Sequence, residues 1–296
     1  QEGRLRKEKH GVSILFRSER PLCVNIEPFP KLFPSSVHFF LSVFLFQGCV
    51  FMTFKLILEY DGSNFSGWQA QPERRTVQGE LEKALETALR HPVRVTVAGR
   101  TDAGVHASGQ TAGFETDVEI DPLRLKKTLN GILPRDVTVV ELAGTYPGFH
   151  ARYDARSRTY RYTISDRRIS IGRNHVWHVK SRISRELLEE ATRPIIGQCN
   201  LRGFSKGSEH DDYSTVIFKN LWMFERNLMI FEITAVRFFH HAVRSIVGSA
   251  VEVARGRENP DFLRRILATG DRSLAGPTAP ARGLCLVRVD YGEENP

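Results

Sequence analysis

Ala98-Gly99-Arg100-Thr101-Asp102-Ala103-Gly104-Val105-His106 is the most informative stretch of this chain. It follows an alternating run of β-branched residues, 93–97, which predicts a strand. Glycines then interrupt the alternation, so the stretch is predicted to be a loop at a strand end. The loop carries one carboxylate, Asp102, with Arg100 two residues before it and His106 four residues after it. Because glycine lets a backbone approach a ligand closely, Asp102 is a candidate functional residue. The alternative is an ordinary Asp-x-Gly turn beside a solvated arginine.

The sequence around this loop predicts a β-α-β-β-α-β unit. Apolar residues alternate over 53–60, and leucines recur every fourth position after Thr76, a residue suited to cap a helix. Asp121-Pro122 has the pattern of a cap followed by a first-turn proline. The predicted elements are strand 53–60, helix 76–90, strands 93–98 and 109–116, helix 121–131 and strand 137–140. This order is typical of a ferredoxin-like unit with an antiparallel sheet and helices on one face.

The second half of the chain has a similar plan. Its predicted elements are strand 159–164, helix 184–193, strands 215–224 and 228–236, helices 239–255 and 259–270, and strand 284–289. The predicted fold class is therefore α+β. Two ferredoxin-like (RRM-like) halves would join into one mainly antiparallel sheet, with helices packed on it and a central cleft. We place the N-terminal half at 52–150, where it carries the Asp102 loop, and the C-terminal half at 151–296.

Charge and cysteine content narrow the functional class. The 296 residues carry a formal net charge of +8. Arginine is much commoner than lysine, which suits bidentate phosphate contacts. The four cysteines form no CxxC pair, so we interpret them as reduced thiols of a cytoplasmic protein. Without residues 1–51, which hold seven Lys or Arg and four Asp or Glu, the net charge is still +5. A basic balance favours nucleic acid as a partner only weakly.

Residues 1–51 do not resemble the rest of the chain. They lack helical or strand periodicity, apart from an apolar run at 37–46. That run is too short to cross a membrane, which takes about 20 residues. Met52 directly precedes the first regular strand. We therefore predict that 1–51 is an extraneous or disordered extension without a catalytic role, with a targeting segment as the alternative.

Two further stretches carry residues suited to chemistry on nucleic acid. Tyr160 and Tyr162 alternate on one strand, so they share a face and Arg161 points the other way. Several arginines precede this strand, and aromatic rings among arginines suit base stacking combined with phosphate contact. The alternative is a half-buried strand with solvated arginines. The arginines are Arg152, Arg156, Arg158 and Arg161.

The second stretch lies at the start of the predicted helix 239–255. Arg244 lies one turn after His240 and shares its face. An arginine beside the apolar stripe of a core helix suggests an anionic partner, although it could also extend to solvent. His240 and His241 would point in different directions on a helix, which makes them poor joint metal ligands. With no H-E-x-x-H motif and no cysteine cluster, the sequence predicts no metal site.

These residues together resemble a known family. The stretch 99–106 is similar to the active-site motif of the TruA-type tRNA pseudouridine synthases, and the resemblance extends from about Met52 to Tyr291. Other pseudouridine synthase families carry an Arg-Leu-Asp version of this motif. The supporting motifs, in family order, are Glu59-Tyr60-Asp61-Gly62, Gly67-Trp68-Gln69, Thr76-Val77-Gln78, Phe149-His150-Ala151-Arg152, Tyr160-Arg161-Tyr162, His240-His241 with Val243-Arg244, and Gly283-Leu284 with Leu286-Val287.

The resemblance implies an enzyme with the pseudouridine synthase fold. Such an enzyme would isomerise uridine to pseudouridine in the anticodon stem-loop of tRNA, at positions 38–40. It would use no cofactor and no metal, act in the cytoplasm as a homodimer, and have no membrane partner.

The resemblance also implies roles for individual residues. Asp102 would be the catalytic aspartate, and Arg244 would be its paired arginine. Arg100 would enter the base stack, and Tyr160 would pack against the displaced base. Leu284 would line an apolar pocket. The residues interpreted as contacting RNA are Arg152, Arg158, Arg161, His240 and His241.

Two other functions remain as alternatives. One is a catalytically silent tRNA-binding protein on the same scaffold. The other is a hydrolase that pairs Asp102 with a second carboxylate, such as Asp61 or Asp154, for acid–base work.

Overall fold

The structure is a computed structural model that describes residues 52–207 and 212–292. All of these residues fall within one compact unit. The predictions made for residues 1–51 lie outside the described residues. So does the last part of the C-terminal half, 293–296.

The N-terminal half has the predicted element order. Thr76 caps its first long helix by accepting a hydrogen bond from the amide of Gly79 at 3.2 Å, and Asp121 caps the second by accepting from Arg124 at 2.9 Å. The elements are β1 (Met52–Tyr60), α2 (Val77–Leu89), β2 (Thr96–Val97), β3 (His106–Thr116), α3 (Pro122–Ile132) and β4 (Val137–Thr145). β2 is shorter than predicted because the Val95 amide donates to the Glu82 side chain instead of to a neighbouring strand.

The C-terminal half also follows the prediction, with two short strands added. Its elements are β5 (Ser157–Ser165), β6 (Trp177–His178), α4 (Arg185–Thr192), β7 (Gly197–Asn200), β8 (Ser214–Glu225), β9 (Leu228–Ala235), α5 (Ala242–Ala254), α6 (Phe262–Thr269) and β10 (Leu284–Asp290). β6 and β7 have two and four residues, too few for the alternation of apolar and polar side chains to be visible in the sequence.

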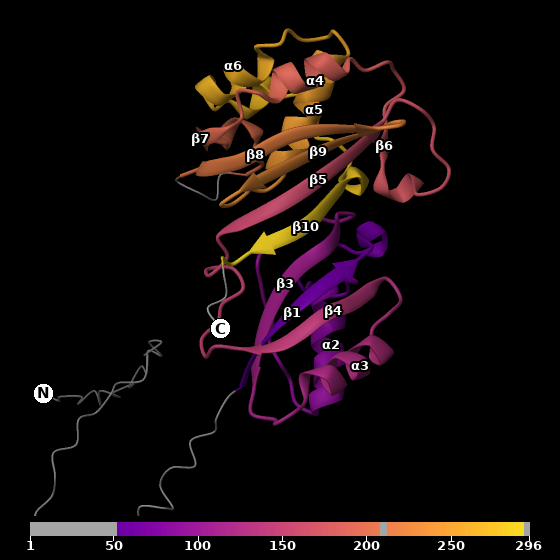
Figure 1. Ribbon diagram of the computed structural model, residues 1–296, viewed down its shortest axis with the longest axis vertical. Helices are drawn as coiled ribbons and strands as arrows, with labels where there is room; N and C mark the ends of the chain where they lie inside the picture. The colour runs from indigo at the N-terminus through magenta and orange to yellow at the C-terminus, as the bar shows by residue number, and fades with distance from the viewer. Residues whose placement is uncertain (1–51, 208–211, 293–296) are drawn as a thin grey trace, which may run out of the picture. The chain divides into compact units, whose positions relative to one another are not determined.

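One sheet runs through both halves in the order β4-β1-β3-β10-β5-β9-β8-β7, with β2 beside β3 and β6 beside β5 (Figure 1). All pairs are antiparallel except β3 with β10 and β5 with β6. The last strand of the chain, β10, lies between the halves and joins them, with Cys285 opposite His106 and Leu286 opposite Ala107. The predicted α+β fold with a mainly antiparallel sheet is confirmed.

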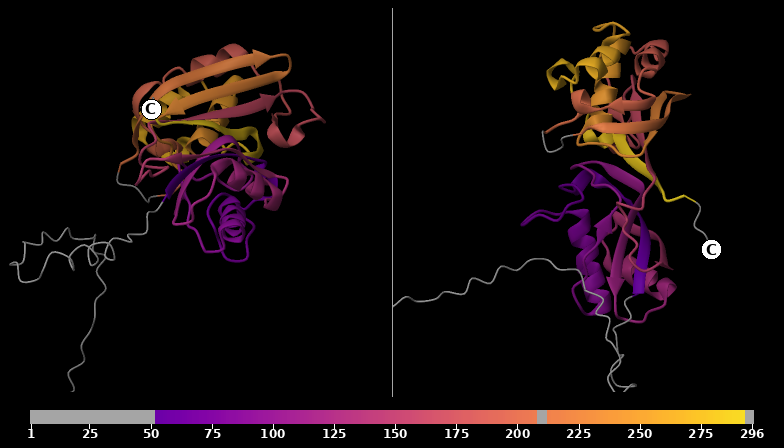
Figure 2. Two further views of the ribbon diagram at one scale, coloured as in Figure 1. Left: turned by 60° about the horizontal axis from the view of Figure 1, so that its bottom comes forward. Right: turned by 90° about the vertical axis from the view of Figure 1, so that its left-hand side faces the viewer.

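The helices cover the sheet and complete the core. In the N-terminal half α3 lies beside β4 and α2 lies beside α3, while in the C-terminal half α5 contacts α4, α6 and β5 (Figure 2). The sheet supplies alternate buried residues such as Phe54, Leu56 and Leu58 on β1. Eleven of the 13 residues of α5 are buried, so this helix is enclosed on nearly every side. Arg244 therefore lies on the most enclosed helix of the half.

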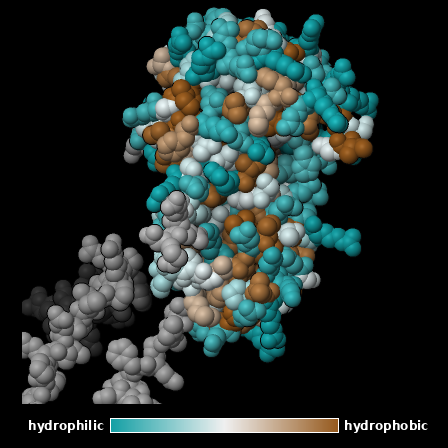
Figure 3. All heavy atoms as spheres, viewed as in Figure 1, coloured by the Kyte–Doolittle hydropathy of each residue, from teal (hydrophilic) through white to brown (hydrophobic). Residues whose placement is uncertain are grey.

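The face seen in Figure 3 is mostly hydrophilic, with small groups of apolar side chains. The most exposed large apolar residues, Ile171, Tyr153 and Leu123, come from separate elements and loops. Among the helices of the described residues, none is long and apolar enough to cross a membrane.

Candidate active site

The loop that carries Asp102 is fixed by hydrogen bonds from the N-terminal half. The hydroxyl groups of Tyr60 and Thr101 lie 2.8 Å apart, and both residues are buried. The amide of Trp68 donates to the Thr101 carbonyl at 3.0 Å, and the side chain of Gln110 donates to the Gly99 carbonyl at 2.8 Å. These bonds hold the loop at Gly99 and at Thr101, the residue directly before Asp102, so the backbone at the carboxylate has a defined position.

Glycine is required beside this loop. Gly67 has φ +98°, and a Cβ there would lie 2.9 Å from the carbonyl oxygen of Thr101. Gly104 has φ +78°, which turns the chain from the loop into β3. Gly104 thus accounts for a glycine close to the carboxylate in the sequence, and Gly67 for the close approach of a distant segment to the loop.

Arg244 reaches Asp102 from the C-terminal half. Its Nη1 donates to Oδ2 of Asp102 at 2.9 Å, although the two residues are 142 positions apart in sequence. Its Nε donates to the carbonyl of Ala279 at 2.8 Å, which fixes the orientation of the guanidinium. The side chains of Arg244 and Asp102 are 14% and 23% exposed, so this pair is shielded yet open on one side. A charge-assisted hydrogen bond of this kind is stronger than one between neutral groups.

Two histidines complete the surroundings of the carboxylate. Nε2 of His240 lies 3.4 Å from Oδ1 of Asp102, and Nε2 of His241 lies 3.4 Å from Oδ2. The expectation that the two rings point in different directions is wrong, because their centroids are 4.1 Å apart. The reason is that α5 begins only at Ala242. His241 has φ +65° and the preceding residues form a turn, so both rings face the Asp102 loop.

The environment of His241 keeps its imidazole neutral. Burial, the main cause, together with the positive charge of Arg244, lowers the pKa of His241 from 6.5 to about 4, although the charge of Asp102 acts in the opposite direction. Near neutral pH the ring is therefore a dipole beside Oδ2 and not a second cation. A side chain other than glycine in the left-handed region is uncommon, and such conformations gather at functional sites.

The predicted aromatic residue lies beside the same loop. Tyr160 is 8% exposed and packs edge-on against Phe238, with ring centroids 5.3 Å apart. A Cβ on Gly99 would lie 3.7 Å from the Tyr160 hydroxyl, which places the ring next to the start of the loop. Burial raises the pKa of Tyr160, and the nearby Tyr60 and Asp102 raise it further. Tyr160 thus presents a neutral, largely apolar ring beside the Asp102 loop.

The remaining predicted residues divide into buried and exposed groups. Leu284 is buried at the start of β10, opposite Tyr162 of β5. Arg100 and Arg152 are exposed. Arg161 is exposed on the face of β5 opposite to the buried tyrosines, and its Nε donates to Glu232 at 2.6 Å.

Arg158 differs from the other arginines because it is 8% exposed. Its Nε and Nη2 donate to the carbonyl of Ala98, Nη1 donates to those of Ala155 and Val236, and Nη2 also donates to that of Arg152. A guanidinium has five N–H groups, so all of them are used on the backbone. This side chain connects β5 to the start of the Asp102 loop.

The carboxylates considered for a hydrolase have other partners. Asp61 lies beside His106 and His175, at 3.1 and 3.6 Å. Asp154 accepts hydrogen bonds from the Tyr146 hydroxyl and the His150 amide. The geometry therefore gives each of them a different environment from that of Asp102.

Comparison with known proteins identifies the family. The family model described as tRNA pseudouridine synthase matches residues 56–154 and 191–292, more than half of the chain. The chain belongs to the tRNA pseudouridine synthase family. It is similar to tRNA pseudouridine synthase A of Moorella thermoacetica, with 40% identity over 242 residues that cover 80% of this chain and 98% of that protein. It is 38% identical to the protein of the same name from Geotalea uraniireducens, with the same coverage.

A solved structure of a Cbf5-Nop10-Gar1 complex is a more distant match, with a TM-score of 0.35 and 8% identity. The alignment covers 78% of this chain and 57% of that chain. The family matches confirm the predicted resemblance and the predicted class of activity, that of a tRNA pseudouridine synthase, an isomerase. They do not favour a catalytically silent protein.

The residues that hold the Asp102 loop were not predicted from the sequence. Tyr60 and Trp68 lie within motifs that support the resemblance, so a signal was present, but nothing in it indicated contact with Thr101. Gln110 and Ala279 gave no signal, because one lies in an ordinary strand and the other acts through its backbone.

Proposed function

We propose that this tRNA pseudouridine synthase acts on uridine through Asp102. One observation carries the assignment. Asp102, on a loop of the N-terminal half, meets Arg244, from a buried helix of the C-terminal half, at 2.9 Å. The pair lies beside the ring of Tyr160, and the side chain of Asp102 is 23% exposed, so a base can approach the carboxylate.

The isomerisation breaks the bond between N1 of uracil and C1′ of ribose and forms a bond between C5 and C1′. The proton on C5 is lost, N1 gains a proton, and the mass of the RNA does not change. Attack by the carboxylate on the base or on the sugar requires that Asp102 be ionised. Arg244 places a fixed positive charge 2.9 Å from Oδ2 of Asp102.

The two oxygens of Asp102 have different surroundings. Oδ2 accepts from Arg244 and lies beside the half-buried His241, whereas Oδ1 faces only the more exposed ring of His240 among the contacts described. We therefore assign Oδ1 as the oxygen that meets the uridine. We therefore assign His240 and His241 to the surroundings of the carboxylate, whereas from the sequence they were interpreted as residues that contact RNA.

The RNA contacts divide by exposure. Arg100 extends from the loop into solvent, so it can fill the space that a displaced base leaves. Arg152 and Arg161 are exposed and can meet phosphates. Arg158 has all its donors on backbone carbonyls, so we assign it to the fold. The anticodon arm, positions 38–40, the homodimer and the cytoplasmic location are supported by the resemblance alone and stay predictions.

The test is incubation of the full chain with unmodified tRNA transcripts, followed by mapping of pseudouridine through carbodiimide-dependent primer stops. We expect new stops at positions 38–40 and an unchanged RNA mass. Release of free uracil would show a hydrolase. Binding of tRNA without any stop would show a silent binding protein. Stops elsewhere in the tRNA would keep the isomerase and overturn the assigned arm.

We also propose that residues 1–51 have no role in catalysis, since all motifs of the family resemblance follow Met52. A chain that starts at Met52 should modify tRNA at the rate of the full chain. A large loss of activity or of soluble protein would show that the segment belongs to the working enzyme.

A further inference from the structure

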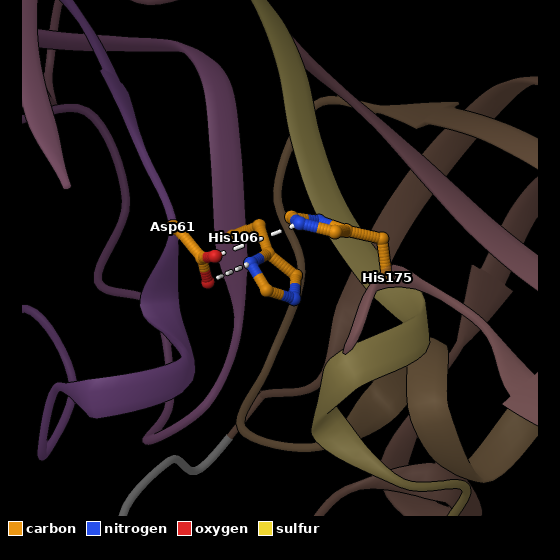
Figure 4. Close-up of side chains that lie close together, drawn as sticks. All are labelled: Asp61, His106 and His175. Carbon is orange, nitrogen blue, oxygen red and sulfur yellow. Dashed lines mark ion pairs between the residues drawn. The ribbon is translucent and has the colours of Figure 1, made fainter. Parts of the chain in front are cut away.

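A second carboxylate, that of Asp61, lies between two histidines, one of which is His106 at the end of the Asp102 loop. Asp61 directly follows β1, His106 begins β3, and His175 ends η2 (Arg173–His175), a short helix between β5 and β6. Oδ1 of Asp61 is 3.1 Å from Nδ1 of His106, and Oδ2 is 3.6 Å from Nε2 of His175. Figure 4 shows the carboxylate facing both rings, which come from opposite halves of the sheet.

The hydrogen bonds of His106 indicate that Nδ1, the ring nitrogen beside the Asp61 carboxylate, carries a lone pair and no proton. Nε2 of His106 lies 3.0 Å from the carbonyl of Asn174, which can only accept, so Nε2 carries the proton. Nδ1 then accepts from the amide of Gly62 at 3.1 Å. Nδ1 of His106 and Oδ1 of Asp61 are therefore two acceptors in contact, an arrangement that a cation stabilises. A histidine that donates its second N–H to a carbonyl is also the usual arrangement in metal sites.

The spacing of the ligand atoms fits a small transition metal. In a tetrahedral zinc site with bonds of 2.0–2.1 Å, neighbouring ligand atoms are about 3.3 Å apart. The two distances from Asp61, 3.1 and 3.6 Å, bracket that value. All three ligand atoms lie within 4.8 Å of one another. The side chain of His175 is 52% exposed, so its ring can move inward and a water can complete the coordination.

The cluster formed by Asp102, His240 and His241 has similar spacing but suits a metal less well. Its Oδ2 already accepts from the guanidinium of Arg244 at 2.9 Å, and a divalent cation there would meet a fixed positive charge. Asp61 has only the two histidines as ion-pair partners among the described residues. The presence of Arg244 beside Asp102 thus distinguishes the two clusters.

We propose that Asp61, His106 and His175 form a binding site for Zn²⁺, with the carboxylate, Nδ1 of His106 and Nε2 of His175 as ligands. The metal would replace the hydrogen bond that the Gly62 amide gives to His106. Because Asp61 and His106 belong to the N-terminal half and His175 to the C-terminal half, the bound metal would tie the two halves together at the end of the Asp102 loop.

The test uses the untagged full chain after treatment with a chelator. Titration with Co²⁺, followed by its visible absorption, and competition with Zn²⁺ should show one tight site per chain with tetrahedral or five-coordinate spectra. Zn²⁺ should also raise the melting temperature. His175→Ala and Asp61→Asn should each weaken binding on the order of 10-fold or more and remove the thermal shift. His178→Ala, a substitution of a half-buried histidine three residues away, is the matched control and should bind as the unaltered chain does.

Three results would overturn the proposal. The unaltered chain could show no binding at millimolar metal, or His175→Ala could bind as tightly as the control. Alternatively, His240→Ala could remove the metal signal while His175→Ala keeps it, which would place the ion at Asp102. Because exposed His175 can be substituted without disturbing the core, misfolding does not obscure these outcomes.

Discussion

Asp102 and Asp61 are each flanked by two histidines, yet they are suited to different chemistry. Each carboxylate faces two histidines at 3.1–3.6 Å. Asp102 also meets Arg244, whereas the ion-pair partners of Asp61 among the described residues are histidines only. One permanent cation, Arg244, therefore decides what a carboxylate between imidazoles can do.

The physical reason lies in what each neighbour offers. A guanidinium has donors and no acceptor and keeps its charge at all relevant pH values, so it holds a carboxylate ionised and repels other cations. A neutral imidazole offers one lone pair and can share a metal ion with a carboxylate. The first arrangement suits a reacting group beside RNA, and the second suits a bound ion.

The largest effect is expected from the residue that distinguishes the two clusters. Arg244→Ala leaves a shielded carboxylate without its partner, and breaking such pairs costs about 3–5 kcal/mol. We expect the single-turnover rate of pseudouridine formation to fall about 10²- to 10³-fold, with little change in tRNA affinity, because many phosphate contacts remain. Arg257→Ala, which breaks an ion pair to Glu252 of α5, is the control and should keep its rate. If tRNA affinity falls while the rate stays, Arg244 acts on the RNA.

A smaller effect is expected at Arg100, in the same loop but exposed. Removing Arg100 should slow pseudouridine formation at a paired target uridine on the order of 10-fold, since displacing a base costs a few kcal/mol. Arg100→Ala should be partly rescued when the target uridine is mismatched or lies in an unpaired loop. Arg244→Ala should show no such rescue. The measurement is single-turnover pseudouridylation of both substrates by both variants, and equal sensitivity to pairing would remove the division of roles.

The smallest effect concerns the pH dependence of stability at His241. The pKa of His241 is about 4 in the folded chain and 6.5 in the unfolded chain. Between pH 4 and pH 6.5 the unfolded chain therefore binds a proton at this residue that the folded chain does not bind. Unfolding free energy should therefore fall as pH decreases from 6.5 to 4, by less than about 1.4 kcal/mol per unit from this residue. His241→Asn, which tolerates the left-handed conformation, should give a shallower slope in urea denaturation at several pH values. An unchanged slope would contradict the assigned environment.

Much of the fold was predictable from local patterns. Alternation identified β1 and β5, and Thr76 and Asp121 marked helix starts that the structure confirms through their hydrogen bonds. The parallel pairing of β3 with β10 could only be expected in outline, because it joins residues about 180 positions apart. Nothing in either strand specifies its partner.

One contact of the candidate site was expected from the family resemblance, whereas the features that the backbone decides were not expected. The predicted pairing of Asp102 with Arg244 agrees with the observed contact. The turn at His241 was missed, since a left-handed histidine has no sequence signal, and it reverses the expected direction of two rings. In the sequence Arg158 could not be distinguished from the exposed arginines near it, although its guanidinium donates hydrogen bonds to the carbonyls of four residues.

The most direct test compares Asp102→Asn with Asp61→Asn in the full chain, using single-turnover pseudouridine formation on unmodified tRNA together with tRNA affinity. Each variant removes one negative charge and keeps the shape of the side chain. We predict that Asp102→Asn abolishes product, a loss of at least about 10³-fold, while Asp61→Asn stays within about 10-fold and both bind tRNA nearly as the unaltered chain does. Near-normal turnover by Asp102→Asn, or an equal loss in both variants, would contradict the claim that the arginine-paired carboxylate is the reacting group.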